Sequence, residues 1–62
     1  PKIGNNVKIM TGAKVLGNIT IGDNVTIGAG AIIVKDVPSD CVVVGGKAYI
    51  VKRNGKKIRE EL

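Results

Sequence analysis

Few residues in this sequence are suited to acid–base or nucleophilic chemistry. The 62 residues include no histidine and one cysteine, Cys41. A thiol without a histidine beside it stays mostly protonated near neutral pH, so Cys41 is interpreted as a packing or loop residue. Asp23, Asp36 and Asp40 occupy positions typical of turns and loops. The sequence therefore predicts no catalytic residue in this chain, and with no histidine and a lone cysteine it predicts no metal site.

The basic side chains suit a different chemistry, the binding of anions. The net charge is +5, and residues 47–62 hold six basic side chains against two acidic ones. A solvated end that keeps the protein soluble is the simplest explanation. A nucleic-acid site would add stacking aromatics, and Tyr49 is the single aromatic residue, so we expect no nucleic-acid partner. A phosphate-bearing small ligand is the third explanation, with Lys35, Lys52 and Arg53 as its partners.

The elements that must position these residues follow a six-residue repeat. Six consecutive hexads run from Ile3 to Pro38, and 12 of the 18 residues at their second to fourth positions are Gly, Asn or Asp, which permit tight corners. The fifth position is always apolar, and the first is always Ile or Val: Ile3, Ile9, Val15, Ile21, Ile27 and Ile33. This pattern predicts an all-β hexapeptide parallel β-helix, in which three hexads form one triangular coil.

Two other structures compete with this interpretation. An amphipathic helix would need apolar spacing near 3.6 residues and few Gly and Asn residues, so it is excluded. A chain of antiparallel hairpins remains an alternative, because "NITIGDNVTIG" also reads as two short strands around a turn.

The predicted organisation has three parts. Residues 1–38 form about two coils, a stack about 10 Å high. Residues 39–53 form a loop and two closing strands, Cys41 to Val44 and Ala48 to Val51. Residues 54–62 follow an Asn54-Gly55 turn as a basic tail, either a short helix or frayed. Repeat folds generally need about three units, so we expect further chain before Pro1.

Composition favours a cytoplasmic protein with no membrane partner. The chain is 44% hydrophobic, yet no apolar run approaches the roughly 18 residues that span a bilayer. There is no secretory signal pattern, and a single cysteine excludes an internal disulfide.

Three stretches resemble the carboxy-terminal part of the hexapeptide acyltransferases, most closely the serine O-acetyltransferases: "PKIGNNV", "VLGNITIGDNVTIGAGAIIVKDVP" and "VVVGGKAYIV". The resemblance implies a left-handed β-helix, although the general rule for crossovers favours the right hand. It also implies homotrimers, acetyl-CoA as donor and the L-serine hydroxyl as acceptor in cysteine biosynthesis. The histidine that serves as general base in such enzymes would fall before Pro1.

The residues that the resemblance assigns to coenzyme binding are backbone groups and cations. Backbone around Gly12, Ala29 and Gly30 would line the pantetheine groove, while Lys35 and Lys52 would approach the phosphates. Where the family has Pro-Ala, this chain has Lys47 before Ala48. Without the proline, the backbone φ at this position is no longer fixed, near where the resemblance places the adenine end of the coenzyme.

Other functions stay open. Family tails that dock into cysteine synthase end in isoleucine, whereas this chain ends in Glu60-Glu61-Leu62, so that partner is uncertain. The alternatives to a serine acetyltransferase are a catalytically inactive trimerising β-helix and an acetyltransferase that acts on a sugar or another hydroxyl acceptor.

Overall fold

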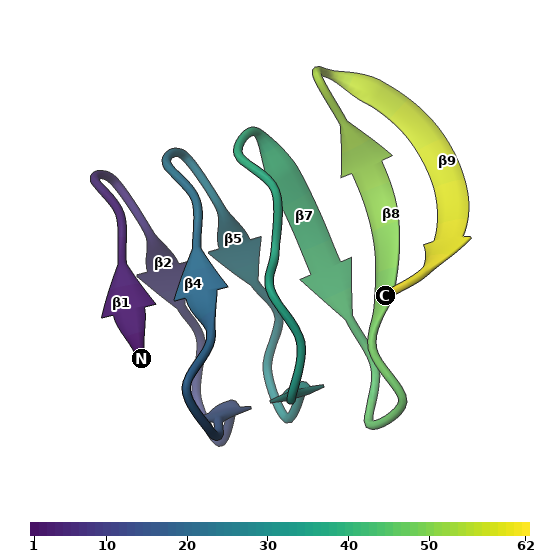
Figure 1. Ribbon diagram of the computed structural model, residues 1–62. Helices are drawn as coiled ribbons and strands as arrows, with labels where there is room; N and C mark the ends of the chain where they lie inside the picture. The colour runs from purple at the N-terminus through teal and green to yellow at the C-terminus, as the bar shows by residue number, and fades with distance from the viewer.

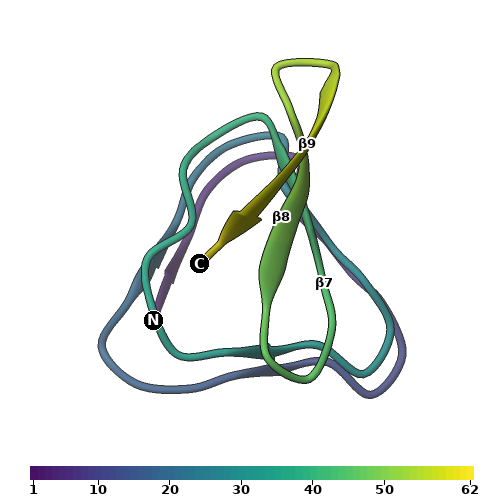
Figure 2. The same ribbon diagram turned by 90° about the vertical axis from the view of Figure 1, so that its right-hand side faces the viewer.

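A computed structural model describes all 62 residues, Pro1–Leu62. The chain folds into a coil of short strands, followed by a longer strand and a hairpin at the C-terminal end (Figure 1), and the coil is triangular in cross-section (Figure 2). The strands are β1 (Lys2–Ile3), β2 (Lys8–Ile9), β3 (Lys14–Val15), β4 (Thr20–Ile21), β5 (Thr26–Ile27), β6 (Ile32–Ile33), β7 (Cys41–Val44), β8 (Tyr49–Arg53) and β9 (Lys56–Glu61). The chain contains no helix able to cross a membrane.

Parallel pairing between successive coils confirms the predicted β-helix and excludes the chain of antiparallel hairpins. β1 pairs with β4, β2 with β5 and β3 with β6, all in parallel. Each pair joins first-position residues 18 positions apart: Ile3 with Ile21, Ile9 with Ile27, and Val15 with Ile33. In Figure 2 the chain runs clockwise as it advances toward the viewer, so the β-helix is left-handed.

The core of the prism is made by the inward positions of the hexads. Ile21, Ile27 and Ile33 are 0% exposed, and Val25 and Ala31 fill the space between them. In the first coil, Ile3 and Ile9 have the same register but are 45% and 47% exposed, because no strand stacks on their other side. Burial therefore increases along the prism toward its C-terminal end.

Side chains at one corner join the coils. The Asn6 amide donates to Asn24 Oδ1, and the Asn24 amide donates to Asp40 Oδ1, both at 3.3 Å. All three residues have a positive φ, which Asn and Asp tolerate better than other side chains. We define Asn5–Asn6, Asp23–Asn24 and Ser39–Asp40 as the asparagine corner.

The second coil is shorter than the hexads predict. Val37 bridges to Ile21 and Val43 pairs with Ile27, both 16 residues on instead of 18. The Asp36 side chain accepts a hydrogen bond from the Thr20 N–H at 2.8 Å, and the Val37 N–H donates to the Thr20 carbonyl at 3.0 Å. The corner thus closes two residues early, and the coil continues past Pro38 into β7.

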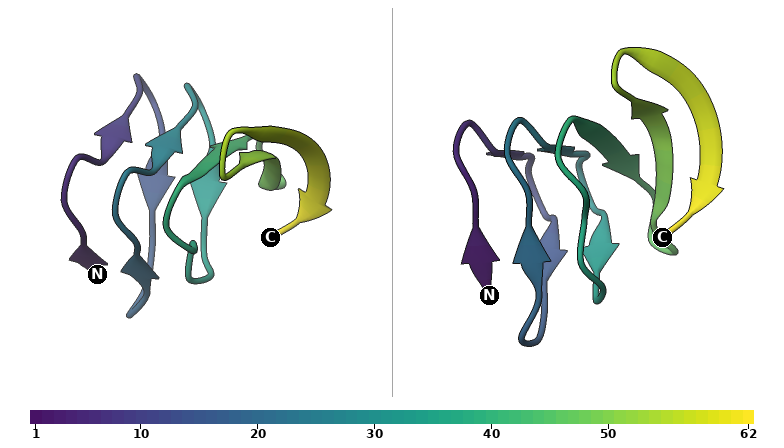
Figure 3. Two further views of the ribbon diagram at one scale, coloured as in Figure 1. Left: turned by 90° about the horizontal axis from the view of Figure 1, so that it is seen from above. Right: turned by 45° about the horizontal axis from the view of Figure 1, so that its top comes forward.

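The tail is a strand, so the expectation of a helix or a frayed end is wrong. Asn54 and Gly55 have φ of 51° and 79°, the geometry of a two-residue hairpin turn. This turn reverses the chain and lets β9 pair antiparallel to β8, with Ile58 and Leu62 packed against the core. Figure 3 shows this hairpin curling beside the last coil.

Candidate functional site

A second corner of the prism exposes backbone without side chains. Gly12 and Gly30 have φ of 75° and 73°, and a Cβ built on Gly12 would lie 3.8 Å from the Gly30 nitrogen. The Gly30 N–H donates to the Thr11 carbonyl at 2.9 Å, so the two corners stack directly. A Cβ on Gly30 would meet nothing within 4 Å, and Ala29 beside it is exposed. We call Thr11–Gly12, Ala29–Gly30 and Gly45–Gly46 the glycine corner.

A pocket of about 310 Å³ lies where the last coil meets the hairpin. Lys35 reaches it from the corner after β6, Lys47 from the turn after β7, and Glu61 from the end of β9. Gly46 of the glycine corner also lines it, with an apolar wall formed by Ile32, Val34, Ala48 and Leu62. The pocket thus combines an apolar surface with two cations, a lining suited to an amphipathic anion.

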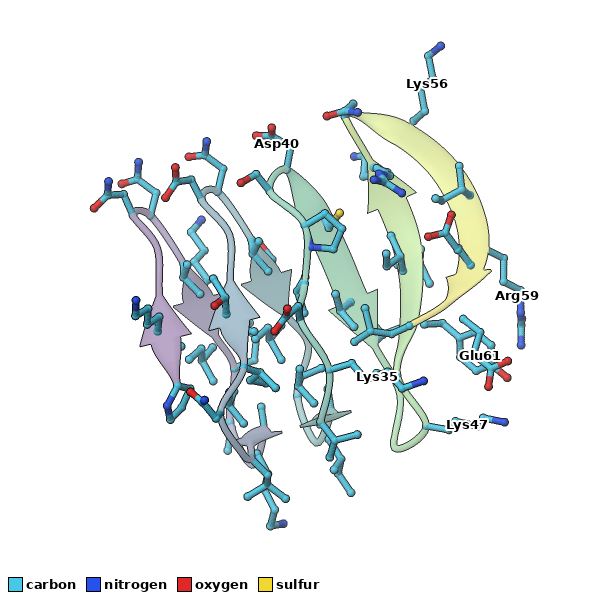
Figure 4. All side chains as sticks on the ribbon, in the orientation of Figure 1. Lys35, Asp40, Lys47, Lys56, Arg59 and Glu61 are labelled. Carbon is cyan, nitrogen blue, oxygen red and sulfur yellow. The ribbon has the colours of Figure 1, made fainter.

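Glu61 holds one of the two pocket lysines. Its Oε1 lies 2.7 Å from Lys47 Nζ, and Figure 4 shows Lys35, Lys47 and Glu61 gathered at the same end of the hairpin. The hydrogen bond and the charge of Glu61 raise the pKa of Lys47. The same hydrogen bond and the positive charge of Lys47, with a smaller contribution from Lys35, lower the pKa of Glu61. Both groups are therefore ionised at neutral pH.

Lys52 and Arg53 lie apart from this pocket. In the hairpin they pair with Lys57 and Lys56, next to the turn, whereas Glu61 pairs with Tyr49 at the opposite end. Arg53 Nη1 lies 3.3 Å from Glu60 Oε2, and the next residue donates its N–H to the Asp40 carbonyl. The structure therefore does not bring Lys52 and Arg53 together with Lys35.

The predicted coenzyme residues thus fall at three places. Gly12, Ala29 and Gly30 form part of the glycine corner, Lys35 lines the pocket, and Lys52 and Arg53 lie near the asparagine corner. Sequence reasoning missed Glu61 and gave Lys47 no role beyond the proline that it replaces. The sequence offered one signal for this site, the positive charge of Lys47 beside the Gly45-Gly46 turn. The pairing of Lys47 with Glu61 could not be seen, because it depends on the register of β8 and β9.

The cysteine and aspartates have structural surroundings, as their interpretation as packing and turn residues predicts. Cys41 is 1% exposed, burial raises the pKa of its thiol, and its Sγ donates to the Ser39 carbonyl at 3.4 Å. Asp23 accepts the Asn5 N–H at 2.7 Å, while Asp36 and Asp40 accept the corner bonds described above. A buried protonated thiol is a poor nucleophile.

The Tyr49 ring also has a neighbour. The Arg59 guanidinium lies 4.8 Å from the ring centroid, within the range of a cation–π contact. One face of the single aromatic side chain is therefore covered by Arg59.

Comparison with known proteins identifies relatives across the whole chain. A serine acetyltransferase of Synechococcus elongatus is 53% identical over 58 residues, which cover 94% of this chain and 24% of that protein. The serine acetyltransferase of Bacillus subtilis is 48% identical over 62 residues, covering 100% and 29%. The chain thus spans about a quarter of the length of the curated relatives that it matches.

Solved structures show the same fold. A maltose O-acetyltransferase from Clostridium difficile superposes with a TM-score of 0.78 at 47% identity, covering 95% of this chain and 29% of that one. A serine acetyltransferase from Brucella abortus superposes with a TM-score of 0.79 at 40% identity, covering 100% and 22%.

A family model described as bacterial transferase hexapeptide (six repeats) matches residues 1–35. These residues include the first-position Ile and Val side chains that stack along the prism. The chain therefore belongs to the bacterial transferase hexapeptide family.

Proposed function

We propose that this chain is the donor-binding, carboxy-terminal β-helix of a serine O-acetyltransferase, which transfers acetyl from acetyl-CoA to the hydroxyl of L-serine in cysteine biosynthesis. The observation that supports it most is the identity of 48% and 53% to proteins named serine acetyltransferase, over 100% and 94% of this chain. The match extends through the pocket lysines to the end of the chain or close to it.

In this proposal the chain binds the donor and the base lies elsewhere in the protein. A hydroxyl attacks a thioester efficiently only when a base accepts its proton, and this chain has no histidine to do so. The buried Cys41 thiol and the three aspartates bonded to backbone or amide groups are poor substitutes. Catalysis then depends on positioning the acetyl group for a base that this chain does not supply.

The glycine corner and the pocket would divide the coenzyme between them. The pantetheine arm can approach the backbone at Gly12, Ala29 and Gly30, where the largest side chain is the methyl group of Ala29. The phosphates would lie at the pocket, near Lys35 and Lys47, because these two cations line one cavity that also includes Gly46 of the glycine corner. Lys52 and Arg53, at the other end of the hairpin, would not contact the same phosphates.

A homotrimer would complete the groove. Leu16 is 50% exposed and Val34 is 58% exposed, and their positions lie one above the other on successive coils. Ile32, 38% exposed, adds to this apolar surface beside Lys14. Exposed apolar side chains of this size are typical of a surface that is covered by another subunit.

The test uses the protein at the full length encoded by its gene. Native mass spectrometry with and without coenzyme A measures subunit number and ligand occupancy, and an acetyl-transfer assay compares L-serine with maltose. The proposal predicts trimers or multiples of trimers, one coenzyme A per subunit and transfer to L-serine. A protein that binds no coenzyme A would contradict it and favour an inactive trimerising β-helix.

A sugar acetyltransferase is the second candidate. It is favoured by the 47% identity to the maltose O-acetyltransferase, which lies within the range found for the serine enzymes. Transfer to maltose and not to L-serine would establish it.

A further inference from the structure

Glu61, at the end of β9, is an acidic residue among those that line the pocket containing Lys35 and Lys47. Glu61 pairs with Tyr49 across the hairpin, and the Leu62 N–H donates to the Ala48 carbonyl at 3.1 Å. These contacts fix Glu61 beside the turn that holds Lys47. Backbone pairing therefore places the main chain of Glu61 beside Lys47, while its side chain stays free to turn.

Glu61 is surrounded by the groups that would bind an external anion. Its carboxylate is bonded to Lys47 Nζ at 2.7 Å, and Lys35 lines the same pocket. Figure 4 shows the three side chains on one side of the molecule, away from Lys56 and Asp40. The Glu61 carboxylate is negatively charged and accepts hydrogen bonds through two oxygens, as an anionic group of a bound ligand would.

The ion pair between Glu61 and Lys47 is weak. The two side chains are 56% and 73% exposed, and exposed ion pairs of this kind contribute little to stability because water and salt screen them. A phosphate has more charge and more acceptor oxygens than a carboxylate. It can therefore displace Glu61 from Lys47 at small cost.

We propose, on the basis of the proposed function, that Glu61 is a specificity-determining residue that occupies Lys47 until a phosphate-bearing ligand replaces it. An uncharged ligand cannot compete for Lys47 and leaves the Lys47–Glu61 pair in place. Ala48 and Leu62, the part of the apolar wall outside the proposed subunit contact, would contact the uncharged part of the same ligand. Glu61 then lowers the affinity for phosphate-bearing ligands and has no effect on neutral ones.

The test measures binding by calorimetry in the full-length protein, with coenzyme A as the phosphate-bearing probe and pantetheine as the neutral one. The Glu61→Gln variant removes the charge and keeps the shape. We expect it to bind coenzyme A about two- to fivefold more tightly, an effect that shrinks as salt is raised, with pantetheine binding unchanged. Glu60→Gln is the matched control, because Glu60 is the adjacent residue and pairs with Arg53, outside the pocket.

Each outcome decides a separate point. If wild-type protein binds coenzyme A and Glu61→Gln binds it equally well, the role of Glu61 is wrong and the proposed function stands. If Glu60→Gln tightens binding as much as Glu61→Gln, the phosphates lie at Arg53 and the inference is overturned. If neither wild type nor variants bind coenzyme A while thermal unfolding shows them folded, the proposed function itself fails.

Discussion

In the coil, each of the strands β1 to β6 has two residues and pairs with a strand one turn away in space, whereas β8 and β9 have five and six residues and pair with their neighbour in sequence. The coil buries Ile21, Ile27 and Ile33 completely, while β9 buries no residue fully. Both ion pairs of the structure, Lys47–Glu61 and Arg53–Glu60, lie in the hairpin region. The coil is thus held by stacked apolar side chains, whereas the hairpin adds one buried residue, Ile50, to the core and takes part in both ion pairs.

Removing a core side chain should give the largest difference between the two regions. Ile27→Ala leaves a cavity where the side chain is 0% exposed, so we expect a loss of about 2–5 kcal/mol in the free energy of unfolding. Ile58→Ala, on the half-buried face of β9, should cost clearly less. Denaturant unfolding of the two variants measures this. Equal losses would mean that β9 is as much a part of the core as the coil.

Substituting two glycines that have similar backbone geometry distinguishes an effect on stability from an effect on coenzyme binding. Gly30 in the coil has φ of 73° and Gly55 in the hairpin has φ of 79°, and a Cβ on either meets nothing within 4 Å. Alanine at each should cost about 1–2 kcal/mol of stability, because L side chains disfavour this region. Only Gly30→Ala should also weaken coenzyme A binding, since its methyl group projects into the proposed groove.

The opposite pattern in calorimetry would move the donor site. Binding weakened by Gly55→Ala and unaffected by Gly30→Ala would place the pantetheine arm along the hairpin turn. Thermal unfolding of both variants shows whether the measured protein is folded at the temperature of the titration.

The smallest effect is expected from single lysines. Lys35→Gln removes one exposed cation of the pocket and should weaken coenzyme A binding about two- to fivefold. Lys52→Gln removes an exposed cation near the hairpin turn and should leave the affinity unchanged. A titration series at increasing salt should bring Lys35→Gln and wild type together. A larger loss for Lys52→Gln would restore the phosphate site predicted from the sequence.

The coil could be predicted because its structure is periodic and local. Each hexad begins with an inward Ile or Val, and most corner positions are Gly, Asn or Asp, so the register of Ile9 on Ile27 follows from counting. The shortening of the corner before Val37 could not be predicted by counting hexads, because it depends on the hydrogen bond between Asp36 and Thr20 of the preceding coil. The repeat thus predicts the stacking and misses local exceptions that depend on contacts between coils.

The hairpin was harder to predict because its pairing is set by tertiary contacts. The Asn54-Gly55 turn was visible in the sequence, but the following residues, with two lysines, an arginine and two glutamates around Ile58, suit a strand or a helix equally. Packing of Ile58 and Leu62 on the core selects the strand. Lys47 and Glu61 are 14 positions apart, and only this register brings them together.

A structure of the full-length protein with coenzyme A bound would show whether this chain holds the donor. We expect the pantetheine arm to lie along Gly12, Ala29 and Gly30. The phosphate oxygens should lie near Lys35 and Lys47, with Glu61 turned away from Lys47. Phosphates bound at Lys52 and Arg53, or coenzyme A bound away from the coil, would contradict it.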